Sequence, residues 1–488
     1  MERTVLEERD ALSMERLASI TKEHTAQEPF GDYFRKTASF VIKMDEVYRK
    51  IKDGKTESYT LEQWQAFNQS LYEEILPENY EHSYGDPKYA VEKLGEVHGR
   101  ILSFLYAELY ALIGYAFEQR LHEKVILQEL LIEVYNCFEE EELPGYRRIQ
   151  QIIYWFESDY SEITVAHRIR EAVDPKLDFA AKIVMESDLK DLRYLYRYGE
   201  YITENERKMA EFMNSLDEET VEKMASTFTE GYRIGFVLGG KDLSKKQTVN
   251  IRYMVGFERM VRLAIRNFEK MGLKPVIYRA ALERINKKGV HRIGYYGAIP
   301  NRQFDYDHRA DQAIYLDKAF MERRLGVMRS AYENYKTLAN GHAGPACIDT
   351  FGEPEFYPQT KPEAYYLSDK QKKLQTQMDN ESVQITNRYI IGKERSFTII
   401  AFPVPEIGAD FPEIFKETIR INTLDYQLYA DIQQKLIDAL DQGESVHVLG
   451  KGENHTDMHI ALHKLNDPKK QTNFENCVAD VNIPVGEV

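Results

Sequence analysis

Cysteine is scarce in this sequence: Cys137, Cys347 and Cys477 are the three among 488 residues. They are odd in number and far apart, so they form neither a CxxC pair nor a disulfide framework. Chains without disulfides are typical of reducing compartments, and we therefore expect a cytoplasmic protein.

Long apolar runs and an excess of basic residues are also missing. The N-terminus carries the charged Glu2 and Arg3 and lacks the apolar core of a signal peptide. The most apolar stretch, residues 101–117, is short and contains Ser103 and Glu108, which favours a buried helix over a membrane span. The net charge of −16 argues against nonspecific binding to nucleic acid or to anionic membranes, since both attract Lys and Arg.

Hydrophobic residues nevertheless make up 43% of the chain, which is enough for buried cores and excludes wholesale disorder. The length predicts two to four domains. The 33 tyrosines suit packed helical interfaces, because a tyrosine buries its ring while keeping a polar tip.

Residues 1–228 predict an all-helical domain. Thr60 with Gln63, and Thr203 with Glu206, have the spacing of a helix-capping box. A buried helical face is indicated by apolar residues at steps of three and four: Leu102, Leu105, Leu109, Leu112 and Ala116. No motif assigns this domain a role.

Residues 229–440 predict an α/β domain. A strand over 245–252, a helix over 257–268 and a strand over 274–278 form a βαβ unit of about thirty residues, which implies a mostly parallel sheet. Gly272 stands where a left-handed helix cap belongs. We also expect helices over 311–338 and 414–440, a strand over 397–403, and a surface excursion over 351–379.

Residues 441–488 predict the β-rich start of a third, incomplete domain. Residues 445–449 read as a strand, and residues 455–462 alternate polar and apolar side chains as a strand does. Residues 477–483 form another strand-like run. The following Pro484-Val485-Gly486-Glu487 would turn the chain and present Glu487 at a strand end.

These last residues carry a resemblance to a known family. The patterns Asn454-x-Thr456-Asp457-x-x-Ile460-x-Leu462 and Asn482-Ile483-Pro484-x-Gly486-Glu487-Val488 are similar to those of the thermophilic-aminopeptidase (leucyl aminopeptidase-like) family of two-metal peptidases. The resemblance covers residues 230–488 and is most specific over 454–488. Family members carry an α/β domain before the metal domain, so residues 1–228 would be an addition.

The resemblance implies a metalloaminopeptidase that removes N-terminal residues from peptide substrates. In the family, the position that maps onto Glu487 binds a pair of divalent ions, often zinc or cobalt, which activate a water molecule. The other ligands and the catalytic residues lie downstream in the family. We therefore expect this chain to be an N-terminal portion of a longer enzyme, without catalytic residues of its own and inactive alone. Family members are commonly homodimers.

Two other clusters have metal-like composition. His455, Asp457, His459 and His463 would suit zinc, but on a strand they share one face and are also typical of a solvated surface. The resemblance assigns Asn454, Thr456 and Asp457 to support of a strand turn instead. The cluster of Asp305, Asp307, His308, Arg309 and Asp311 would bind a cation, line a domain contact, or cap the helix that follows.

Three further readings compete with the peptidase. A non-catalytic helical and α/β scaffold that binds a partner fits the absence of a complete site. A nucleotide-binding protein is disfavoured, because Gly235, Gly239 and Gly240 do not have the GxGxxG spacing. Cys347 would need a paired His to be a nucleophile, and we expect it to be a small buried residue.

Overall fold

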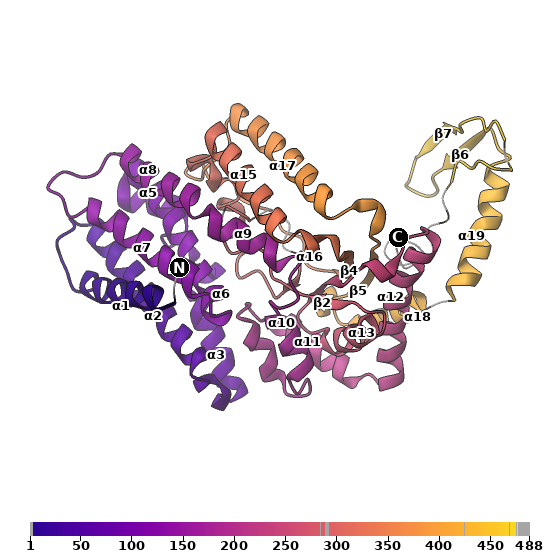
Figure 1. Cartoon of the computed structure of the whole chain (residues 1–488), viewed down its shortest axis with the longest axis horizontal. Coiled ribbons are helices and arrows are strands. Elements are labelled where there is room, and N and C mark those ends of the chain that lie inside the picture. Colours follow the sequence, from indigo (N-terminus) through magenta and orange to yellow (C-terminus); the bar gives the residue numbers. More distant parts are fainter. Residues whose placement is uncertain are drawn as a thin grey trace.

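The computed structural model describes residues 3–283, 285–287, 292–423, 425–467, 469–474 and 476. Helices dominate the chain up to residue 238, a parallel sheet with helices follows, and a small antiparallel hairpin lies near the C-terminal end (Figure 1). The predicted fold class, helical and then α/β with a β-rich end, is confirmed. We call residues 3–238 the helical region and residues 248–423 the sheet region.

The helical region begins with helices that pack on one another around a shared core. The capping boxes at Thr60 and Thr203 are both present, and they open α3 and α11. The main helices are α1 (Arg3–Ile20), α2 (Phe30–Lys52), α3 (Leu61–Tyr72), α4 (Pro77–Tyr80), α5 (Pro87–Leu109), α6 (Ala111–Phe117), α7 (Leu121–Cys137), α8 (Tyr146–Asp159), α9 (Ser161–Glu171), α10 (Phe179–Glu186), α11 (Glu204–Ser215) and α12 (Glu218–Leu238).

The apolar stretch in α5 and α6 lies in the middle of this core. The span Pro87–Phe117 is long and apolar enough to cross a membrane, but 89% of its most apolar window is buried inside the protein. Leu102, Leu105 and Leu112 are each at most 1% exposed. The burial favours the core helix that the sequence predicted, since a helix that is apolar all round must be covered.

The sheet region is built on parallel strands in the order β2-β1-β4-β5, with a short β3 beside the end of β1. The strands are β1 (Thr248–Met254), β2 (Lys274–Val276), β3 (Tyr295–Tyr296), β4 (His342–Phe351) and β5 (Thr398–Pro403). β1 and β4 are buried along most of their length, as parallel strands covered on both faces should be.

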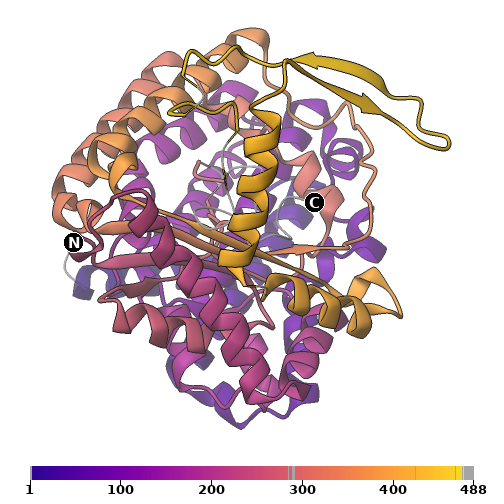
Figure 2. The same cartoon turned by 90° about the vertical axis from the view of Figure 1, so that its right-hand side faces the viewer.

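Helices of the sheet region cover these strands (Figures 1 and 2). The predicted βαβ unit is confirmed, because α13 connects the parallel strands β1 and β2, and Gly272 has a φ of +84° after it. α12 packs against α13 and β5, so the boundary expected at residue 229 falls inside a helix that also covers the sheet. The helices are α13 (Glu258–Lys270), α14 (Arg302–Asp307), α15 (Lys318–Asn334), α16 (Lys336–Asn340), α17 (Asp369–Tyr389) and α18 (Phe411–Asn422).

Several element bounds differ from expectation because side-chain caps start new helices. The helix expected over 311–338 begins at Lys318, since the Asp317 side chain accepts a hydrogen bond from the Phe320 N–H. The surface excursion ends at Ser368, whose capping box with Gln371 opens α17. The helix expected over 414–440 is two helices, because Asp425 caps α19 (Tyr426–Leu440).

The C-terminal unit consists of α19 and the hairpin of β6 (Ser445–Leu449) and β7 (Asp457–Ala461). It projects from the sheet region in Figure 1. Both strands fall where the sequence predicted them. The strand expected at 477–483 lies outside the described residues.

Candidate functional site

A large cavity lies where the helical region meets the carboxyl end of β2 and the neighbouring strand β3. Its volume is about 690 Å³, and Ile277, Tyr278 and Tyr295 contribute to its lining from the sheet region. In α/β proteins, ligands bind beyond the carboxyl ends of parallel strands, so this position is where a ligand would be expected. We call it the main cavity. The helical region contributes the aromatic side chains of Trp64 and Phe117.

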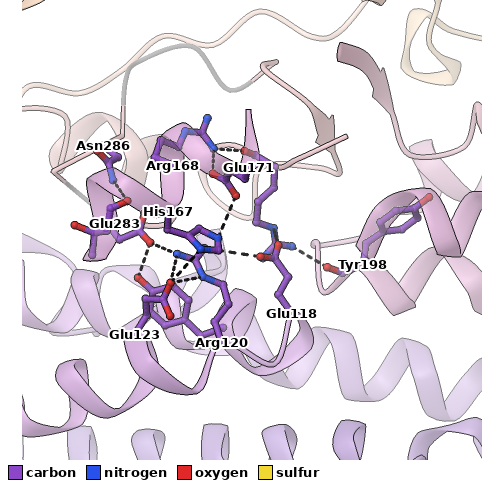
Figure 3. A network of polar contacts seen from close by, with 12 residues as sticks. Glu118, Arg120, Glu123, His167, Arg168, Glu171, Tyr198, Glu283 and Asn286 are labelled. Carbon is purple, nitrogen blue, oxygen red and sulfur yellow. Dashed lines mark hydrogen bonds and ion pairs between the residues drawn. The ribbon is translucent and has the colours of Figure 1, made fainter. Parts of the chain in front are cut away.

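A buried network of charges forms one wall of the main cavity (Figure 3). Arg120, on the loop before α7, is 9% exposed and joins both regions. Its Nη2 lies 2.8 Å from Glu123 Oε1 and 2.6 Å from Glu283 Oε1. The Tyr115 hydroxyl donates to the same Glu283 oxygen over 3.0 Å. A buried guanidinium group is tolerated here because carboxylates surround it.

His167 lies between two carboxylates of the same network. Its Nδ1 is 3.7 Å from Glu123 and its Nε2 is 3.6 Å from Glu171. Burial alone would lower the His167 pKa, but the hydrogen bond with Glu171 and both carboxylates outweigh it and raise the pKa. Burial opposes ionisation of Glu171, yet Arg168 and His167 lower its pKa to about 2. This wall therefore favours a charged imidazolium.

Arg279 extends the buried charge network toward the sheet. It follows β2 and is 3% exposed. Its Nη2 lies 2.7 Å from Glu200, and its Nε lies 3.1 Å from Glu118. It lines a smaller cavity of about 150 Å³ together with Tyr72 and Asn301. Both of its carboxylate partners belong to the helical region.

Glu258 is a buried carboxyl group reached through Tyr194, a residue of the main cavity. The Tyr194 hydroxyl and the Gly256 N–H both donate to Glu258 Oε2 over 2.8 Å. Burial raises the Glu258 pKa to about 7, although these hydrogen bonds lower it. Glu258 can therefore gain or lose a proton near neutral pH, at the N-terminus of α13.

This arrangement favours binding over covalent chemistry. The guanidinium and carboxylate groups of the wall are engaged with one another, which holds the wall rigid and leaves little of their charge for an acid–base pair. Further charged residues of both signs line the main cavity, including Lys176, Lys182, Asp178 and Glu186. Such a chamber suits a polar small molecule held between the two regions.

A second candidate site lies on the C-terminal hairpin. His447 of β6 pairs directly with His459 of β7, and their rings stack with centroids 3.7 Å apart. His447 Nε2 is 2.7 Å from Asp457 Oδ1. Among the described residues, these three alone place His, Cys, Asp or Glu ligand atoms within 4.8 Å of one another in a group of three or more. The arrangement is a candidate metal site.

The hairpin brings together some of the predicted site residues and not others. Asp457 and His459 meet, while His455 and His463 lie outside the group. Asn454 Oδ1 accepts hydrogen bonds from the Thr456 N–H at 2.9 Å and hydroxyl at 2.6 Å, and so forms the turn that opens β7. The expected structural role of Asn454 and Thr456 is confirmed. Glu487, the expected metal ligand, lies outside the described residues.

The cluster at residues 305–311 is a contact between the two regions. His308 Nε2 lies 2.7 Å from the Gly85 carbonyl oxygen, and its Nδ1 lies 2.7 Å from Asp311. Asp307 accepts from the Tyr80 hydroxyl and pairs with Lys361, each at 2.8 Å. The domain-contact interpretation is confirmed. The helix-capping interpretation is wrong, because Asp317 caps the following helix α15.

The positions of Cys347 and of the glycines at 235–240 disfavour a nucleophile and a phosphate-binding loop. Cys347 is a free, buried thiol on β4, and burial raises its pKa to about 11, which disfavours a nucleophilic thiolate. Gly235 is buried within α12, and Gly239 and Gly240 follow its end, so these glycines form no phosphate loop ahead of a helix.

Sequence reasoning missed His447 and the charges around Arg120. His447 stood in a predicted strand, and pairing that strand with the next one in an antiparallel register would have placed it opposite His459. Arg120 and Glu283 are 163 residues apart, and no local pattern connects them.

Comparison with known proteins gives no match: the chain matches no family model, no curated protein and no solved structure.

Proposed function

We propose that this chain belongs to a metal-dependent aminopeptidase, for which it supplies a helical region, an α/β region and the opening of the metal-binding domain. The reaction is hydrolysis of the first peptide bond of a peptide by a metal-activated water. Glu487 is the ligand that the chain contributes, and the metal pair is zinc or cobalt. The protein is cytoplasmic, and two copies of the chain associate as a homodimer.

The observation that carries the proposal is the turn and strand at residues 454–461. The resembling pattern needs Asn454 and Thr456 to turn the chain into a strand. In the structure, these two side chains bond to each other and β7 starts at Asp457. The parallel α/β sheet precedes this hairpin, in the order that the resemblance implies.

The described residues do not assemble the two-metal centre by themselves. One carboxylate cannot hold a catalytic ion, since a working site needs several ligands and an open position. The His447, Asp457 and His459 group is not the family's ligand set. We therefore derive no catalytic step from these residues, and we expect residues 1–488 to be inactive alone.

The test is metal-dependent release of leucine from a leucyl anilide. Purified residues 1–488 with added zinc or cobalt should give no activity above buffer, and activity of this chain would contradict the proposal. Reading the source DNA past Val488 should reveal a frame with further His, Asp and Glu ligands. The longer product should be active, and Glu487→Gln should reduce both its bound metal and its activity at least about 100-fold.

A non-catalytic scaffold is the second candidate, and exposed apolar side chains favour it. Leu428, Ile432 and Leu436 of α19 are 46–59% exposed at i, i+4 spacing, and Met458 and Ile460 of β7 are also exposed. Apolar faces of this kind mark interaction surfaces. A stop codon directly after Val488, together with an inactive chain that binds a partner through α19, would favour the scaffold over the peptidase.

A further inference from the structure

The hairpin displays three metal-ligating side chains on a single face. His447 and His459 are directly opposed across β6 and β7, and Asp457 lies two residues before His459 on the same strand. Side chains two apart on a strand point to the same side, so all three project together. Val446, Val448, Met458 and Ile460 occupy the other face. The two faces are thus chemically distinct.

We propose that His447, Asp457 and His459 bind a divalent transition-metal ion such as Zn²⁺. Two imidazole nitrogens and one carboxylate oxygen are the donors of three-ligand zinc sites. In a tetrahedral site with bonds of about 2.1 Å, ligand atoms are about 3.4 Å apart. The ligand atoms here are all within 4.8 Å of one another, and His447 and Asp457 are 2.7 Å apart, so small side-chain rotations suffice.

Because His447, Asp457 and His459 are exposed, the fourth ligand of the ion comes from outside the hairpin. All three residues are exposed, so the fourth position faces solvent and takes a water molecule or a donor from another molecule. The carboxylate–imidazole contact of His447 and Asp457 is replaced by two bonds to the ion. The site is a single-ion site and does not depend on Glu487 or on the proposed peptidase activity.

A bound ion stabilises the hairpin. An isolated two-stranded hairpin is marginally stable in water, and every residue of β7 is exposed. An ion held by His447 on one strand and by Asp457 and His459 on the other links the strands and fixes their register. Metal binding of this kind contributes directly to folding free energy.

The experiment uses the full 488-residue chain with Co²⁺ as a spectroscopic probe and Zn²⁺ as its competitor. Wild type should bind one Co²⁺ per chain with the visible absorption of a four-coordinate site, and Zn²⁺ should displace it. His447→Ala and His459→Ala should each weaken binding at least about 100-fold. His463→Ala, an exposed histidine beyond the group, should bind as wild type does.

Glu487→Gln separates this site from the proposed peptidase centre, because it should leave Co²⁺ binding to this chain unchanged. Hydrogen exchange of residues 445–461 gives a second readout, and Zn²⁺ should slow it in wild type but not in His459→Ala. The proposal is overturned if wild type shows no stoichiometric ion. It is also overturned if the histidine variants bind as tightly as wild type, or if Glu487→Gln abolishes binding.

Discussion

Glu258 couples the folded state to pH near neutrality. Its pKa rises from about 4.5 to about 7 because it is buried, so the folded chain holds a proton between these values that the unfolded chain releases. The folded state is therefore favoured below pH 4.5, and stability falls as pH rises through 7. The effect of this single group is about 3 kcal/mol.

We expect Glu258→Gln to flatten the decline in the free energy of unfolding between pH 5 and pH 8. A glutamine oxygen in the place of Oε2 can still accept from Tyr194 and Gly256. Urea denaturation at several pH values measures the slope. Glu417→Gln, on the exposed surface of α18, is the control and should keep the wild-type slope. An unchanged slope in Glu258→Gln would contradict the burial argument.

Arg279 stabilises the junction of the two regions through buried ion pairs. Replacing it with Met would remove the cation next to Glu200 and one of the two cations next to Glu118, which also lies 3.8 Å from Arg120 Nη1. Breaking one partner of a buried ion pair costs about 3–5 kcal/mol. Arg420→Met removes an exposed i,i+3 pair with Glu417 and should change stability by less than about 1 kcal/mol. Equal losses in thermal or urea unfolding would show that the Arg279 pairs are not structurally important.

At the scale of elements, short sequence motifs predicted the helix ends that are set by interactions between residues close in sequence. The capping boxes at Thr60 and Thr203 and the left-handed Gly272 were read from the sequence, because each depends on residues within one turn. The caps Asp317 and Asp425 were missed because apolar residues continue on both sides of them. A hydrophobic pattern gives the face of a helix but not the residue at which the helix starts.

The apolar row of α19 shows the same limit in another form. We expected a helix over 414–440, and α19 forms its second half, but Leu428, Ile432 and Leu436 recur on it at i, i+4 spacing and remain exposed. Periodicity indicates that a face will be covered and does not name what covers it.

Substitutions on α19 distinguish a free face from a packed one. Ile432→Ser with Leu436→Ser should change the free energy of unfolding by less than about 1 kcal/mol and should weaken self-association in sedimentation velocity experiments. Ile437→Ala is the matched control on the same helix. Ile437 is 7% exposed, so its truncation should cost about 2 kcal/mol or more. A loss as large in the double variant would mean that the row is already covered.

At the scale of the whole molecule, the main cavity could not be predicted from the sequence. Its wall is made by residues from α7, α9 and the segment after β2, which meet only when the helical region docks on the sheet region. The candidate metal group was half predicted, since Asp457 and His459 lie close in sequence and His447 required the hairpin register. Glu487 stays a prediction.

The contacts between the regions predict how the molecule unfolds. Arg120 with Glu283, Arg279 with Glu118, and His308 with the Gly85 carbonyl tie residues of the helical region to the sheet region through buried groups. The two regions also share one continuous hydrophobic core. We therefore expect them to unfold as a single cooperative unit, because neither can separate without exposing charges that are paired across the junction.

The C-terminal unit should behave differently. Among residues 426–461, Ile437 is the one apolar side chain described as buried, and the strands β6 and β7 expose most of their residues. Few buried contacts mean a low free energy of local opening. Hydrogen exchange with mass spectrometry should therefore show peptides of β6 and β7 exchanging orders of magnitude faster than those of β1, β4 and α5.

The same experiment tests the cooperative unfolding of the helical and sheet regions. Peptides of α5 and β4 should exchange together as denaturant is added. If the helical region opened before the sheet region, that result would contradict the shared core.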